Sequence, residues 1–133
     1  MGININKNDV FIDFEEEISA KSIDHCQKNI TQASKKGCDK LIFNFKNVKS
    51  FDNMFLDFVI SVKNRFASIN FYNVNINLLP AFYLLKLDQI ANFYTSEHDA
   101  IHEVKPIIKR RFGIVHQKIL MFLTSILVLT NIA

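Results

Sequence analysis

Two histidines four residues apart, His98 and His102, are the first candidates for chemistry. On a helix this spacing places both imidazoles on one face, as in zinc-binding helices. Asp99 stands where a metalloprotease helix carries glutamate, and no third ligand is evident in the sequence. The alternatives are a zinc hydrolase and a solvated helix face. We expect the solvated face and no metal site.

Other reactive residue types also lack the partners that catalysis needs. Glu15, Glu16 and Glu17 are consecutive, so their carboxylates do not converge on one point, and we expect a solvated turn. Cys26 falls on the apolar side of its helix, where packing outweighs nucleophilic use. Because no Gly-rich loop, Ser/His/Asp ordering or carboxylate pair is present, we expect no enzyme and no cofactor.

Asp52 is the most informative polar residue, because it follows a buried strand and a short polar turn and precedes an apolar helical stripe. Its carboxylate is suited to accept a hydrogen bond from the N–H of residue 54 or 55 and to oppose the helix dipole. The alternative role is direct contact with a partner. We expect the capping role first.

Alternating strand and helix patterns must position these residues. Strands are predicted at 10–14, with 3–5 beside it, at 41–45, at 69–74 and around Phe93 and Tyr94. Helices are predicted from Ser19 to Gly37, along the stripe Phe55, Phe58, Val59, Val62 and Phe66, over 78–87, and from Ser96 through Val104. This order predicts an α/β domain with a sheet of four to five strands and helices packed against it.

Composition limits the chain to one domain and an appendage. It has 133 residues, 49% of them hydrophobic, with thirteen Phe against three Gly and two Pro. Two cysteines and no secretory leader pattern favour a reducing cytoplasmic setting. Positive charge is not spread among aromatic residues over the predicted domain, so we expect no nucleic-acid partner.

The carboxy-terminal segment differs in character. Residues 1–104 carry eleven basic and thirteen acidic side chains, whereas 105–133 carry five basic and no acidic ones. An uncharged apolar run, 119–133, follows the cations, although a full bilayer crossing needs about 20 apolar residues. We therefore predict two units: a domain at 1–104, and a basic linker with an apolar membrane-associated or membrane-entry helix at 105–133. The residues expected at the membrane surface are Arg110, Arg111, Phe112 and Lys118. The alternative is that this helix folds back onto the domain.

The element order and three local features resemble the STAS domain, the fold of anti-sigma-factor antagonists and of regulatory domains attached to transporters. Asp52 and Leu56 match the first and last residues of the family's Asp-Ser-Ser/Thr-Gly-Leu motif. The segment 87–90, Leu-Asp-Gln-Ile, and the segment 93–96, Phe-Tyr-Thr-Ser, are similar to its final strand and Ser-capped helix. The resemblance implies a STAS-like mixed sheet, with the apolar terminal helix as an addition.

The same motif departs from the family at its centre. Met54 occupies the position of the phosphorylated Ser or Thr, and Phe55 replaces the Gly. Met54 cannot accept phosphate, so on–off control by phosphorylation is not expected there. Phe55 must either pack inward or face a partner. The resemblance implies a constitutive docking surface at Asp52, Asn53, Met54 and Asp57.

Two functions follow from the resemblance. Some bacterial permeases of Mla-type lipid-transport ABC systems carry an amino-terminal STAS-like domain before a basic membrane-entry segment, and this chain is similar to such an opening portion. That similarity implies an assembly module at the cytoplasmic face of the inner membrane, with an ABC permease, its ATPase and the bilayer as partners. The alternative is a soluble anti-sigma-factor antagonist that acts by partner exchange.

Overall fold

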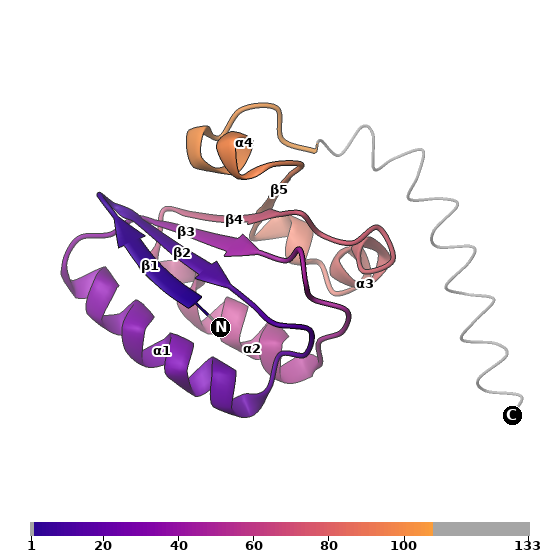
Figure 1. Cartoon of the computed structure of the whole chain (residues 1–133), viewed down its shortest axis with the longest axis horizontal. Coiled ribbons are helices and arrows are strands. Elements are labelled where there is room, and N and C mark those ends of the chain that lie inside the picture. The colour runs from indigo at the N-terminus through magenta and orange to yellow at the C-terminus, as the bar shows by residue number, and fades with distance from the viewer. Residues whose placement is uncertain (1, 108–133) are drawn as a thin grey trace, which may run out of the picture.

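A mixed five-stranded sheet, in the spatial order β1-β2-β3-β4-β5, organises the chain (Figure 1). The computed structural model describes residues 2–107. The strands are β1 (Gly2–Asn6), β2 (Asp9–Asp13), β3 (Lys40–Asn44), β4 (Ser68–Tyr72) and β5 (Asn92–Tyr94). β1 pairs antiparallel with β2, and all later pairs are parallel. The predicted α/β class and strand number are confirmed.

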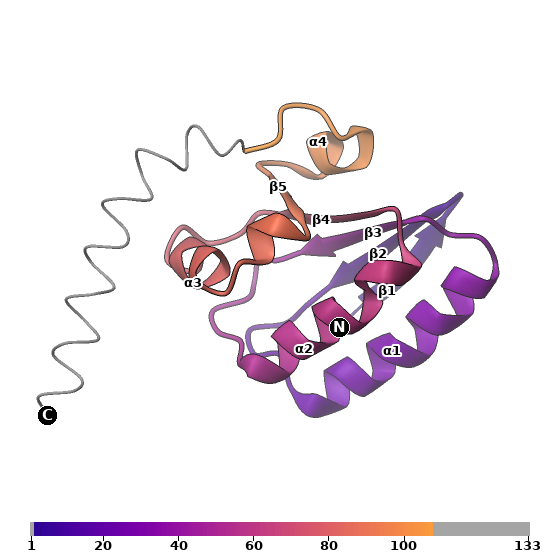
Figure 2. The ribbon, with the colours of Figure 1, turned by 180° about the vertical axis from the view of Figure 1, so that it is seen from behind.

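Helices cover the two faces of the sheet unequally. The helical elements are α1 (Ala20–Lys35), α2 (Asn53–Val62) with the 3-10 turn η1 (Lys63–Arg65), α3 (Leu79–Leu84), η2 (Leu87–Gln89) and α4 (Glu97–His102). Figures 1 and 2 show α1 and α2 against one face and α4 against the other. On the α4 side, Ile42, Tyr72, Tyr94 and Ala100 form a small second core.

Phenylalanine fills the main core, between the sheet and the helices α1 and α2. Nine rings form a connected network: Phe14, Phe43, Phe45, Phe51, Phe55, Phe58, Phe71, Phe82 and Phe93. The parallel strands β3, β4 and β5 supply one ring each, the helices α2 and α3 supply three, and the connecting segments supply the rest. The many tilted and edge-to-face contacts are the geometries that aromatic quadrupoles favour.

The predicted helices are right in place but wrong in length at three positions. α2 ends at Val62 and continues only as η1, so Phe66 reaches the core from extended backbone beyond the helix. The helix predicted over 78–87 is α3 followed by η2, because Lys86 adopts a left-handed conformation with φ 59°. The last helix ends at His102, where Glu103 has φ 53°. Apolar periodicity continued through these breaks, so it concealed them.

Candidate partner-binding site

Asp52 stands at the amino end of α2 and caps it. Its backbone is extended, with φ −118° and ψ −174°, and its Oδ1 accepts a hydrogen bond of 3.0 Å from the Met54 N–H. The strand β3 and the turn after it deliver this residue to the carboxyl edge of the sheet. Asn44 shapes that turn, because its side-chain Oδ1 accepts the Lys46 N–H at 3.0 Å. The capping role predicted from the sequence is the one the structure shows.

The four residues predicted to contact a partner lie on one exposed surface. Asp52, Asn53, Met54 and Asp57 are all exposed at the first turns of α2. Met54 leaves 45% of its surface open to solvent, although it is a large apolar residue. The structure therefore brings the predicted residues together, with an apolar side chain where the family motif has a hydroxyl.

Phe55 resolves the alternative left open by its replacement of glycine, because it packs inward. It is 0% exposed. Its ring centroid lies 5.4–6.2 Å from those of six other phenylalanines. The start of α2 is thus anchored to the aromatic core rather than turned outward.

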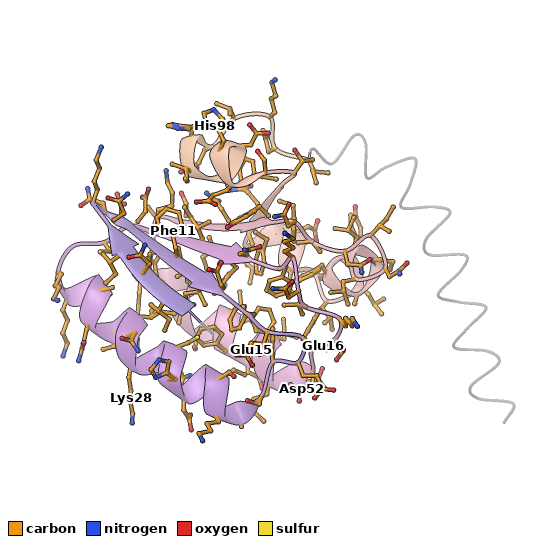
Figure 3. The ribbon with its side chains drawn as sticks, in the orientation of Figure 1. Phe11, Glu15, Glu16, Lys28, Asp52 and His98 are labelled. Carbon is orange, nitrogen blue, oxygen red and sulfur yellow. The ribbon has the colours of Figure 1, made fainter. Side chains whose placement is uncertain are left out.

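Acidic side chains surround this helix end. Figure 3 places Glu15, Glu16 and Asp52 at the same end of the molecule. The loop before α1 and the turn before α2 run together there, because Glu17 and Ser50 form a β-bridge and the Lys49 N–H donates to the Glu16 carbonyl at 2.9 Å. Lys49 also makes an exposed ion pair with Glu16, with Nζ and Oε1 3.1 Å apart.

The helix α3 adjoins this surface through aromatic contact. Phe51, next to the capping residue, lies 4.9 Å from the ring centroid of Phe82, which is the buried residue of α3. α3 also exposes an apolar side chain, Leu84, with 51% of its surface open to solvent. The periodicity of 78–87 predicted this helix but not its contact with Phe51.

The other sequence candidates among the described residues stand apart from this surface. His98 and His102 lie side by side on the exposed face of α4, with ring centroids 4.5 Å apart, and no cluster of three metal-ligating side chains occurs among residues 2–107. Cys26 is buried, and burial raises the pKa of its thiol to about 12. Arg110, Arg111, Phe112, Lys118 and the helix predicted at 119–133 lie outside the described residues. Within the described range, every helix is too short or too polar to cross a bilayer.

Sequence reasoning missed a hollow at the carboxyl ends of β3, β4 and β5. Its volume is about 570 Å³, and it is lined by the polar residues Lys46, Asn73 and Thr95 and by apolar residues that include Val74, Leu79 and Ile107. The three polar residues each follow one of these strands closely. That shared position was the available signal, because carboxyl ends of parallel strands meet at one edge.

The fold and this helix end together define a class: α/β domains with one antiparallel edge strand, parallel strands beyond it, and an aspartate-capped helix after the second parallel strand. Comparison with known proteins agrees. The STAS domain family matches residues 2–100. The chain belongs to the STAS domain family. A search among curated proteins found no significant match.

Solved structures show the same fold at low sequence identity. The anti-sigma factor antagonist SpoIIAA in its unphosphorylated form is 16% identical, with a TM-score of 0.65, covering 78% of this chain and 97% of that one. Bacillus SpoIIAA in its phosphorylated form is 18% identical, with a TM-score of 0.61 and coverages of 78% and 98%. The Thermotoga maritima protein TM1081 is 19% identical, with a TM-score of 0.64 and coverages of 77% and 92%.

Proposed function

We propose that this protein is a non-enzymatic binding module that docks one protein partner through the start of α2. Asp52, Asn53, Met54 and Asp57 form the docking surface. Structural likeness to SpoIIAA, an anti-sigma factor antagonist, favours a partner of the anti-sigma-factor kind over a transporter. The predicted order of the two functions is therefore reversed: partner exchange with an anti-sigma factor is the first proposal, and permease assembly the second.

The exposed Met54 side chain carries this proposal. A capped, core-anchored helix end holds an apolar side chain in solvent, where burial against a partner is favourable. The carboxylates of Asp52, at the cap, and Asp57, three residues along the same helix, flank it. The partner that fits has an apolar recess for the thioether and basic residues at its rim, since such charges steer association and select among partners.

Docking at this surface is constitutive in the proposal. Met54 offers no hydroxyl where the family motif has its phosphoacceptor, so no phosphate is added there. Ser61, on the same helix, already donates its hydroxyl to the Phe58 carbonyl at 2.6 Å. The proposal therefore assigns control to the amounts of the partners or to a competing protein.

Two matched substitutions on α2 test the docking surface. Met54 and Ile60 are both 45% exposed, one at the start of the helix and one two turns along. Met54→Glu places an acid in the first turn, which the helix dipole favours, so folding is retained. We expect Met54→Glu to weaken binding to a purified anti-sigma-factor kinase by at least tenfold and Ile60→Glu to change it less than threefold, measured by calorimetry. Equal effects of the two variants would refute this surface.

Permease assembly remains the second candidate because of one sequence observation, the five cations and the apolar run within 105–133. Under this function the partners are an ABC permease and its ATPase, and the site of action is the cytoplasmic face of the inner membrane. Affinity purification from native membranes discriminates the two. Recovery of an ATPase with a permease favours assembly, and recovery of an anti-sigma factor favours the first proposal.

A further inference from the structure

The two edges of the sheet differ in how they end. At β5, the returning chain supplies the Ile107 N–H, which donates to the Phe93 carbonyl at 2.8 Å. At β1, none of the described residues pairs with the outer edge, because the sheet order begins with this strand. One edge is therefore closed by the chain itself and the other is open.

The free backbone groups of β1 can be assigned from its hairpin. Lys7 and Asn8 form a two-residue loop between β1 and β2, with Lys7 at φ 56°. In such a hairpin the flanking residues Asn6 and Asp9 are a hydrogen-bonded pair, and pairs alternate from there. The N–H and C=O groups of Gly2, Asn4 and Asn6 therefore point toward β2. The N–H and C=O groups of Ile3 and Ile5 point to the open edge.

The strand sequence, Gly-Ile-Asn-Ile-Asn, is complementary to itself. If a second β1 runs antiparallel about a two-fold axis at Asn4, Ile3 faces Ile5 of the other copy and Asn4 faces Asn4. The two isoleucine pairs then exchange all their outward hydrogen bonds. Isoleucine meets isoleucine on the core side of the sheet, and amide meets amide on the α4 side.

Nothing on the strand opposes this pairing. Open edges are usually guarded by a charged side chain, a proline or a bulge. β1 has none of these, and its register with β2 runs without interruption from Gly2 to Asn6. Ile5, moreover, leaves 43% of its surface in solvent.

We propose that the β1 edge binds the β1 strand of a second copy of this chain, joining two sheets into one of ten strands. The interface is isologous, with Asn4 on the two-fold axis. It uses a strand edge and leaves the α2 docking surface out of the contact, so it does not depend on the proposed function.

Cysteine cross-linking of the full chain tests the register. Across the axis, the two Asn4 residues form a closely spaced antiparallel pair, with Cα atoms about 4.5 Å apart, a separation that a disulfide spans. The two Asn6 residues lie about 14 Å apart in the same arrangement. Both positions are exposed, which makes Asn6→Cys a matched control, and the native Cys26 and Cys38 are buried.

Under mild oxidation we expect Asn4→Cys to give a covalent dimer at least tenfold faster than Asn6→Cys. Equal rates would mean random collision, or association through another surface such as residues 108–133, and would overturn the proposal, as would no dimer at all.

A second experiment needs no cross-link. Asn4→Lys and Asn4→Asp should each sediment as monomers, whereas their mixture should form dimers, because like charges meet on the axis in the first two cases and opposite charges in the third. A mixture no more associated than its components would contradict the pairing.

Discussion

At the start of α2, two adjacent residues perform opposite tasks. Phe55 is buried among six rings, while Met54 is exposed beside the cap. Both replace small residues of the family motif. Met54 removes the hydroxyl, and Phe55 adds a side chain that fixes the start of α2 to the core. A helix end held this firmly suits a fixed contact surface better than a switch.

Replacing Asp52 measures the cap alone. Asp52→Ala removes the acceptor of the Met54 N–H and should lower the free energy of unfolding by about 1 kcal/mol. Asp52→Asn keeps a side-chain oxygen and should lower the free energy of unfolding by only a few tenths of a kcal/mol. Urea titration of both variants, with Asp24→Ala as an exposed control on α1, checks the order. A cost for Asp52→Asn equal to that for alanine would assign the stability to charge rather than to the hydrogen bond.

Phe55 is expected to be among the most costly residues to truncate. Phe55→Ala leaves a cavity inside the aromatic cluster and should destabilise the fold by about 3–5 kcal/mol. Met54→Ala, at the next position, should change stability by less than about 0.5 kcal/mol, because that side chain is half in solvent. Chemical denaturation distinguishes the two. A small loss for Phe55→Ala would mean that the neighbouring rings collapse into the space.

Cys26 makes stability depend on alkaline pH. Burial raises its thiol pKa to about 12, whereas the thiol of an unfolded cysteine has a pKa of about 8.5. The folded state therefore holds the proton more tightly, and its stabilising contribution, complete below the unfolded pKa, is lost as the pH rises above that value. Between pH 8.5 and about 10, below the ordinary tyrosine range, stability should fall less steeply in Cys26→Ala than in the natural chain. Urea midpoints at several pH values measure this, and parallel slopes would exclude Cys26 as the cause.

At the scale of elements, apolar patterns in the sequence predicted which helix faces pack against the sheet. They did not predict where helices end, because a single residue's backbone conformation decides that. The Phe55, Phe58, Val59 and Val62 stripe correctly placed α2 against the sheet. It could not show that the helix stops before Phe66, because that ring is buried either way. The cap at Asp52 could be predicted because a cap has a local signature. The hollow around Lys46 is lined by residues that follow three different strands, so its only signal was their shared position at the strand ends.

The break at Lys86 is a testable case of local strain. Its left-handed φ of 59° separates α3 from η2, and a residue with a Cβ adopts this region at a cost of about 1–2 kcal/mol. Lys86→Gly removes that cost and adds the chain entropy of glycine, so a net gain of about 0.5–1 kcal/mol is expected. Lys63→Gly, in the right-handed region at the end of α2, should instead destabilise. Thermal melts compare the two, and a loss of stability in Lys86→Gly would show that its side chain contributes contacts worth more than the strain.

At the scale of the whole molecule, the sheet has unequal edges and unequal faces. α1 and α2 enclose the aromatic core on one side, while α4 covers only part of the other and contacts β3, β4 and β5. Phe11 remains half-buried on that second face (Figure 3). On the α4 side of the sheet, the β1–β2 hairpin is thus less covered than β3, β4 and β5, and the proposed pairing of two copies uses the outer edge of this hairpin.

The closing of the β5 edge carries the domain at least as far as Ile107. The sequence placed this boundary at residue 104, but Ile107 donates to Phe93 and packs against the main core. A fragment of residues 1–107 should therefore be more stable than one of 1–104, by about 1–3 kcal/mol for one hydrogen bond and one half-buried side chain. Urea denaturation of the two fragments measures the difference, and Ile107→Ala in the longer fragment separates the side chain from the backbone bond. If both fragments unfold at the same urea concentration, the contacts of Ile107 at the β5 edge add no stability. The difference between the covered β5 edge and the open β1 edge would then have no effect on the free energy of unfolding.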